Sequence, residues 1–394
     1  MTEHPDIITS QAALEDFCAD LAGAPYVAID TEFLRDSTFW PKLCLVQAAI
    51  PGRAAAIDPL APDIDLAPLL RILADKATVK VFHAARQDME IFVRLMGAPP
   101  GPVFDTQIAA MVCGFGDSIG YDKLVAAVAH QQIDKGPRFT NWAERPLSDE
   151  QINYALSDVT HLCVIYERLR SMLDTRGRTD WALEEQTILV NPATYDTDPE
   201  VAWKRLKTRT EKPRFLIILQ AAAAWREREA MRRDQPRNWV MRDDTLLNVA
   251  AQAPKDENGL GRCRGLPKGF AQSRGGQDLL ATVRTAAELP ASAAPKPQPR
   301  RQVDPENMPT VELLRVLLKR AAETHGVAQR LIANAEDMES IAAGRDTLAL
   351  TGWRRQIFGA DAERLINGEL AMAIAEGKVR IFQIEAERDQ AAAD

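Results

Sequence analysis

The first half of the chain alternates short apolar runs with stretches of helical spacing. Residues 26–30, 43–50 and 54–57 are rich in aliphatic side chains, and Pro51-Gly52 supplies a turn between the second run and the third. Runs of this length, bounded by turn residues, are typical of β-strands. The pattern therefore predicts three consecutive strands that pair as a meander.

The segments that follow predict strand–helix units. Residues 66–74 have their apolar positions at helical spacing, and 79–82 form another short apolar run. Residues 86–96 are amphipathic and end at Gly97 and Pro99, which are typical of a helix terminus. A meander followed by strand–helix units predicts a mixed sheet with helices packed on it.

One more strand and a long helix complete this predicted domain. Residues 103–104 read as a short strand, and Asp105 stands where the next helix would be capped. From 148 to about 170 the spacing is helical, and Ser148 followed by Gln151 has the pattern of a capping box. We therefore expect an α/β domain over residues 1–195.

Beyond residue 195 the strand patterns stop and helical patterns take over. We expect one helical domain over residues 208–290, a proline-rich linker over 291–303, and a second helical domain over 304–394. The helices expected in these domains span residues 215–233, 243–251, 277–286, 310–324, 327–343 and 368–387.

Composition restricts the class of protein. The chain has 394 residues without an apolar run of membrane-spanning length, and its first residues lack a basic-then-apolar signal pattern. Five cysteines are scattered without a Cys-x-x-Cys pair, so neither a zinc knuckle nor a disulfide framework is indicated. A cytoplasmic location without a membrane partner is expected.

Charge is distributed unevenly along the chain. The net charge of −8 divides into about −14 for residues 1–200, about +11 for 201–303 and about −5 for the remainder. A basic segment between two acidic ones favours contact with a polyanion in the middle of the chain, although a solvated charged surface would give the same bias.

Acidic residues at three places are candidates for chemistry. Asp30 and Glu32 follow an apolar strand run and share one side of it, where a divalent cation would relieve their repulsion. Asp88 lies at the start of a predicted helix, and Tyr154 and Asp158 are one helical turn apart. Taken singly, the acids would equally be surface residues or helix caps, and the tyrosine a residue at the edge of a core.

Taken together, these residues resemble a known family. Residues 28–33 (Ala-Ile-Asp-Thr-Glu-Phe), 83–88 (His-Ala-Ala-Arg-Gln-Asp) and the Tyr154-x-x-x-Asp158 pair resemble the three exonuclease motifs of the DEDD superfamily, in its tyrosine branch. Residues 39–47, 104–107 and 141–147 are similar to segments of the bacterial ribonuclease D family. The resemblance covers the first domain almost throughout, in motif order and spacing.

The resemblance implies a fold, a cofactor and roles for five residues. The fold would be the ribonuclease H-like exonuclease fold. The four acidic residues would hold two Mg²⁺ or Mn²⁺ ions about 4 Å apart, one activating a water and the other stabilising the departing 3′ oxygen. Tyr154 would orient that water by its hydroxyl, or accept its proton through the metal-bound shell. The product would be a nucleoside 5′-monophosphate. The implied metal ligands are Asp30, Glu32, Asp88 and Asp158.

The basic helical region has its own resemblance. Residues 225–230, 234–237 and 243–247 resemble an HRDC domain, a small helical module found in ribonuclease D and in some helicases. The second helical domain occupies the position of another such module, without matching motifs. Lysine and arginine side chains in the basic middle region would hold the phosphate backbone of single-stranded nucleic acid.

Several residues near the motifs are candidates for substrate contacts. Base stacking would use aromatic rings, each of which more often serves as a core residue, and phosphate contacts would use the cations of the loop before residue 142. His83 would line the pocket, or support it structurally. The candidates are Phe33, Phe39, Trp40 and Trp142 for stacking, and Lys135 and Arg138 for phosphate.

The leading functional hypothesis is a 3′-to-5′ exoribonuclease that trims RNA 3′ ends such as those of transfer RNA precursors, without an obligate protein partner. One alternative is a DNA 3′-to-5′ exonuclease, because carboxylates and metal ions do not themselves distinguish a 2′-hydroxyl. The other is a non-catalytic RNA-binding scaffold, which would have lost a metal ligand. All four acidic positions are present.

Overall fold

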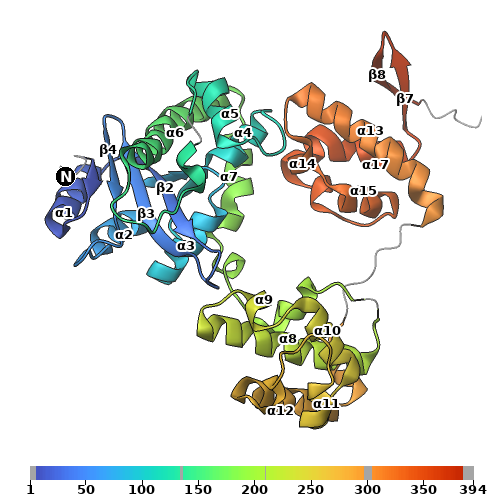
Figure 1. The fold of residues 1–394 in the computed structure, drawn as a ribbon. Helices are drawn as coiled ribbons and strands as arrows, with labels where there is room; N and C mark the ends of the chain where they lie inside the picture. The colour runs from blue at the N-terminus through green and yellow to red at the C-terminus, as the bar shows by residue number, and fades with distance from the viewer. Residues whose placement is uncertain (1–5, 134–135, 209, 297–303, 385–394) are drawn as a thin grey trace, which may run out of the picture.

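The computed structural model describes residues 6–133, 136–208, 210–296 and 304–384 (Figure 1). Its largest sheet has six strands in the order β1-β4-β3-β2-β5-β6. Strands β2 (Tyr26–Leu34), β3 (Lys42–Ile50) and β4 (Arg53–Ile57) pair antiparallel, which confirms the predicted meander. The parallel strands β5 and β6 extend the sheet from β2. Their bounds are Val79–Phe82 and Val103–Asp105.

Two elements at the N-terminal end were not predicted. The short strand β1 (Ile7–Ile8) pairs parallel with β4, and helix α1 (Gln11–Leu21) follows it. The side chain of Ser10 caps α1 by accepting a hydrogen bond from the Ala13 N–H. A strand of two residues carries no periodicity, so its pairing was not predictable from the local pattern.

Helices cover both faces of the sheet, and strand alternation assigns each side chain to one of them. Val27 and Ile29 of β2 belong to the core under α1, α2 (Ala67–Ala74) and α3 (Arg86–Met96). Tyr26 and Ala28 belong to the opposite core, which is covered by α4 (Thr106–Val112) and α6 (Asp149–Thr175). Even-numbered residues of β2 therefore face α6.

Helix α6 begins where the sequence predicted it. The Ser148 hydroxyl accepts from the Gln151 N–H, and the Gln151 side chain accepts from the Ser148 N–H, so both halves of the capping box form. The helix continues to Thr175, beyond the predicted end near residue 170.

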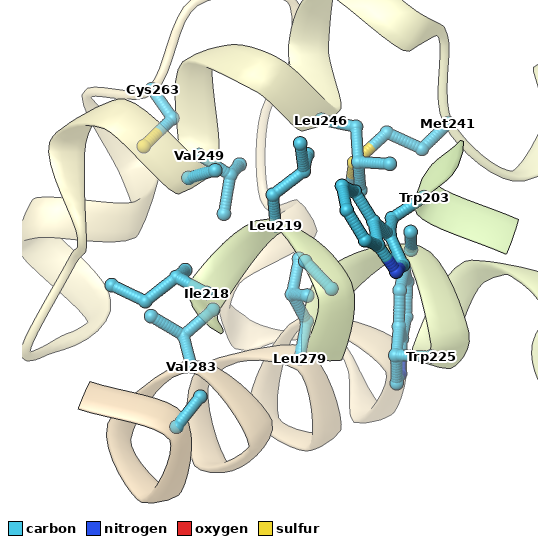
Figure 2. Close-up of a cluster of buried hydrophobic side chains, with 14 of the residues drawn as sticks. Trp203, Ile218, Leu219, Trp225, Met241, Leu246, Val249, Cys263, Leu279 and Val283 are labelled. Carbon is cyan, nitrogen blue, oxygen red and sulfur yellow. The ribbon is translucent and has the colours of Figure 1, made fainter. Parts of the chain in front are cut away.

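The first helical unit has a core of its own (Figure 2). Helix α8 (Pro213–Arg233) contributes Ile218, Leu219 and Trp225, which pack against side chains of α10 and α12 and against Trp203. The bounds of these helices are Asp243–Gln252 for α10 and Arg274–Glu288 for α12, and Trp203 lies in the 3₁₀ segment η5 (Pro199–Arg205).

The last unit departs from the prediction in two places. The helix predicted over 327–343 is interrupted, because Asn334 caps a new helix α15 (Ala335–Ala342) after the short α14 (Gln329–Ile332). The helix predicted over 368–387 is wrong: strands β7 (Leu370–Ala375) and β8 (Lys378–Gln383) form an antiparallel hairpin. Residues 385–387 of that prediction lie outside the described residues.

A two-residue turn explains the hairpin. Ala375 pairs with Lys378, and the two residues between them, Glu376 and Gly377, both have positive φ, 54° and 74°. Such a turn matches the right-handed twist of paired strands. In β7 the large apolar side chains, such as Leu370 and Met372, alternate with alanine, which is the period of a strand. Helix α13 (Met308–His325), by contrast, matches its predicted range closely.

Contacts with the α/β domain dock the last unit. The rings of Trp181 and Trp353 stack with centroids 4.8 Å apart, and the Arg354 guanidinium bonds both carboxylate oxygens of Glu185. Arg178 donates to the main-chain oxygens of His325 and Gly326 at the end of α13. The backbones approach so closely here that a Cβ on Gly114 would lie 2.5 Å from the Gly326 oxygen.

The first helical unit contacts the loop between β2 and β3. Asp234 ends α8 in a left-handed conformation, with φ of 48°, and its carboxylate accepts from the N–H groups of Phe39 and Trp40 at 3.1 and 3.0 Å. The Arg237 guanidinium lies 4.4 Å from the centre of the Phe39 ring. These contacts connect the helical unit to the strand that carries Asp30 and Glu32.

No helix within the described ranges combines the length and apolar character that a bilayer crossing requires.

The Glu185–Arg354 pair offers a test of how the last unit is docked. Each side chain is 12% exposed. Glu185→Ala leaves the guanidinium without its main partner, and we expect a loss of about 3 kcal/mol in docking free energy. Hydrogen exchange of α7 (Thr179–Gln186) should accelerate. Glu184→Ala is the matched control, because Glu184 is 57% exposed and lies 3.6 Å from Arg354. Equal exchange in both variants would contradict the docking role.

Candidate active site

The five residues of the three motifs line one pocket of about 420 Å³. They come from three elements, β2, α3 and α6, which the sheet and its covering helix bring together. The full set is Asp30, Glu32, Asp88, Tyr154 and Asp158.

Asp30 and Glu32 reach the pocket because of strand alternation. Both side chains lie on the same face of β2 as Ala28, and that face is covered by α6. The register between β2 and β3 shifts between Glu32 and Phe33, so the ladder is irregular directly beside the two carboxylates. Bulges of this kind redirect side chains at the edges of active sites.

Asp88 is placed by the turn between β5 and α3. Ala84 has a left-handed φ of 57°, and its N–H and that of Ala85 donate to the Asp105 carboxylate at 3.1 and 2.8 Å. The same carboxylate caps α4 by accepting from Gln107 and Ile108, which confirms the predicted cap. Asp105 thus fixes the turn from which α3 begins.

Hydrogen bonds connect the carboxyl groups to their neighbours. The Thr31 hydroxyl donates to Asp88, and the Tyr154 hydroxyl bonds the Asp158 carboxylate from one turn away on α6. The Tyr121 hydroxyl donates to the main-chain oxygen of Asp158. Each bond fixes a side chain or a backbone segment that borders the pocket.

Burial makes the pocket unfavourable for negative charge. It raises the pKa of Asp30 to about 6. Burial, followed by the charge of Asp30, raises the pKa of Asp158 to about 8, and burial with the charges of three neighbouring acids raises that of Glu32 to about 9. The pKa of Asp88 is also raised well above its usual value, chiefly by burial and then by Asp30. The Arg138 guanidinium acts in the opposite direction on Glu32 and Asp158.

This donor set fits a hard divalent cation. Its donors are carboxylate oxygens, the ligands that Mg²⁺ prefers, and the buried Oδ1 of Asp158 has no hydrogen-bond partner. Within the described residues, no three acidic, histidine or cysteine side chains converge on a single point. Mg²⁺ does not require such a cage, because it retains several waters and binds through one or two carboxylates plus substrate phosphate.

The predicted substrate contacts fall into three groups. Phe33, His83 and Arg138 line the pocket. Trp142 does not: it is 2% exposed in a core beneath the pocket, so the proposal that its ring stacks on a base is corrected. Lys135 lies outside the described residues.

Two further stacking candidates, Phe39 and Trp40, pack against arginine side chains and do not line the pocket. Phe39 is 4% exposed and lies against Arg237, and Trp40 lies under the Arg94 guanidinium, 3.7 Å from its ring centre. Sequence reasoning chose these rings for their proximity to the first motif. It missed Phe139 and Tyr121, which do line the pocket. The available signal for Phe139 was an isolated aromatic residue in a polar loop that contains glycine and proline.

Comparisons with known proteins agree with this geometry. A family model described as 3′-5′ exonuclease matches residues 5–174, and one described as HRDC domain matches residues 216–283. Ribonuclease D of Granulibacter bethesdensis is 47% identical over 96% of each chain. Ribonuclease D of Nitrobacter hamburgensis is 47% identical over 95% of this chain and 98% of its own.

Solved structures of known proteins are also similar to this chain. The crystal structure of Escherichia coli RNase D, described as an exoribonuclease involved in structured RNA processing, is 30% identical with a TM-score of 0.78. The match covers 93% of this chain and 99% of that chain. A protein from Bifidobacterium adolescentis shares the fold at 21% identity, with a TM-score of 0.69 over 92% of this chain and 97% of its own.

The Asp105 carboxylate offers a test of how the pocket is positioned. Asp105→Ala removes the acceptor of four N–H groups, and we expect a loss of about 3 kcal/mol in the free energy of unfolding. Asp105→Asn is the matched control, because its amide oxygen still caps α4, and it should lose about 1 kcal/mol. Urea denaturation measures both. Equal losses would show that the cap and the turn do not depend on Asp105 as described.

Proposed function

The chain belongs to the ribonuclease D family and is a 3′-5′ exoribonuclease, and we propose that its four pocket carboxylates hold two Mg²⁺ or Mn²⁺ ions while Tyr154 positions the attacking water. The observation that carries the proposal is the meeting of Asp30, Glu32, Asp88 and Asp158 in one pocket from three separate elements. When bound, the two cations would activate water and neutralise charge on the scissile phosphate.

The protein's own groups supply orientation and charge. Burial raises the pKa of Tyr154 above its usual value, so its hydroxyl stays protonated near neutral pH and acts by hydrogen bonding. The hydroxyl bonds Asp158, which holds it toward the acidic cluster. The proposed product is a nucleoside 5′-monophosphate.

We assign the remaining predicted contacts to the RNA 3′ end. Arg138 lies close enough to the carboxylates to lower the pKa of two of them, and a phosphate entering the pocket would meet the same cation. Phe33 and His83 line the walls. The His83 Nδ1 lies 3.0 Å from the Thr106 hydroxyl, so the imidazole ring is held in position against the turn before α3.

The helical units are proposed to hold RNA upstream of the 3′ end. The exonuclease domain would span 1–195, the HRDC domain 208–290, the linker 291–303, and a second HRDC-like domain 304–394. The net charge of about +11 over residues 201–303 supports the first module in this role. All five cysteines are free thiols, which fits the cytoplasm as the proposed location.

Removal of one carboxylate should abolish catalysis while the fold is retained. For Asp158→Asn and for Asp30→Ala we expect an approximately 1,000-fold or greater loss of kcat on labelled RNA, together with weaker Mn²⁺ binding by calorimetry. Asp149→Asn, on the exposed first turn of α6, removes the same charge and should leave both quantities near wild type. Near-normal Mg²⁺-dependent nucleotide release by either site variant would refute the assignment.

The tyrosine should act on the chemical step. Tyr154→Phe deletes only the hydroxyl, and we expect kcat to fall about 100-fold with little change in KM, because positioning of a water matters chiefly in the transition state. Steady-state kinetics on a short RNA separate the two constants. A rise in KM at unchanged kcat would assign Tyr154 to substrate binding instead.

The substrate class is proposed to be structured RNA such as precursor transfer RNA. A precursor with a 3′ trailer should be shortened one nucleotide at a time, as resolved on a sequencing gel. Matched DNA should be degraded more slowly, which tests the alternative of a DNA exonuclease. RNA binding without any shortening, in the presence of Mg²⁺ or Mn²⁺, would favour the alternative of a non-catalytic scaffold.

A further inference from the structure

The ring of Phe139 stands almost entirely in solvent. It is 88% exposed, more than any other large apolar side chain in the part of the chain that the structure describes. The residue nevertheless belongs to the wall of the catalytic pocket, together with Asp30, Asp158 and the neighbouring Arg138. Its exposed face at the pocket wall is therefore available to a flat group that enters the pocket.

The segment that carries Phe139 is attached to the catalytic helix. Phe139 ends the 3₁₀ turn η2 (Gly136–Phe139), and the next side chain, Thr140, accepts a hydrogen bond of 2.9 Å from the Gln151 amide. Gln151 lies in the first turn of α6, three residues before Tyr154. Gln151, one of the two residues of the capping box that starts α6, therefore also holds the residue that follows η2.

Phe139 and Arg138 present two complementary surfaces. The Arg138 guanidinium lies 5.4 Å from the centre of the Phe139 ring, and its charge reaches Glu32 and Asp158. A nucleotide offers the same pair of features, an anionic phosphate and a flat base. Aromatic rings stack on all four bases, so such a contact would not restrict the sequence that is trimmed.

We propose that Phe139 stacks on the base of the 3′-terminal nucleotide and thereby holds the last phosphodiester at the carboxylates. This inference rests on the proposed function, because it needs an RNA 3′ end in this pocket. It assigns to Phe139 the binding role that the buried ring of Trp142 cannot fill.

Steady-state kinetics on a short single-stranded RNA give the first measurement. Phe139→Ala should lower kcat/KM by about 5- to 150-fold, the factor that corresponds to one lost base–aromatic stack. The loss should lie mainly in KM, because stacking holds substrate and transition state alike. Phe139→Trp keeps a flat ring and should retain most of the activity. A loss confined to kcat, or an equal loss in the Trp variant, would overturn the proposal.

A cycle that pairs the variant with an altered substrate isolates the contact. An RNA whose terminal nucleotide lacks its base should be a poorer substrate for the wild type by the same factor that Phe139→Ala loses on normal RNA. The Ala variant should not distinguish the two RNAs. If Phe139→Ala lost the same factor in kcat/KM on both RNAs, the proposal would be overturned. A third RNA, which lacks the fifth base from the 3′ end, tests the position of the contact. Coupling with that RNA alone would also overturn the proposal.

Two controls separate this proposal from the proposed function. Phe382→Ala removes another exposed phenylalanine, on β8, and should leave every constant unchanged. Wild-type activity on the normal RNA tests the proposed function itself. If the wild type releases no nucleotides, the proposed function fails. If the wild type is active and Phe139→Ala matches it on both RNAs, only the stacking proposal fails.

Discussion

The electrostatic cost of gathering four carboxyl groups in one partly buried pocket is the constraint on which this structure depends. Burial raises the pKa values of all four carboxyl groups. The charges of the three neighbouring acids raise the pKa of Glu32 further. Because the ionised carboxylates destabilise one another, the pocket favours binding of a multivalent cation, and the bound cation in turn favours binding of a phosphate. The scaffold maintains this arrangement with fixed local features: alternation along β2, the Asp105-bound turn before α3, and the capped start of α6.

Those local features explain how much was predictable. The capping box at Ser148 and the cap at Asp105 each rest on a pattern of a few residues, the meander rests on three neighbouring runs, and all three features are present. The meeting of Asp30 on β2 with Asp158 on α6 in one pocket is not local. It was predicted only through the resemblance of whole motifs, because no single spacing connects a strand near residue 30 with a helix near residue 158.

The failures have physical causes of the same kind. The hairpin of β7 and β8 was mistaken for a helix because the left-handed Glu376-Gly377 turn was overlooked in an apolar segment. Aromatic rings were assigned to stacking by proximity along the chain, yet proximity does not determine exposure. Trp142 became part of a core, while Phe139, three residues before it, remained in solvent at the wall of the pocket.

Asp234 has a consequence for how such enzymes can be recombined. Its backbone ends one helix, and its carboxylate binds two backbone N–H groups of a loop almost two hundred residues away. To Asp234 the loop offers only main-chain N–H groups, so any residue except proline can stand at those two positions, whereas the helical module must supply the acid. A chimera that took its helical module from a relative without an acid at this position would lose both hydrogen bonds. The module is therefore not independent of the domain that it contacts, and position 234 decides which replacement modules can keep these two hydrogen bonds.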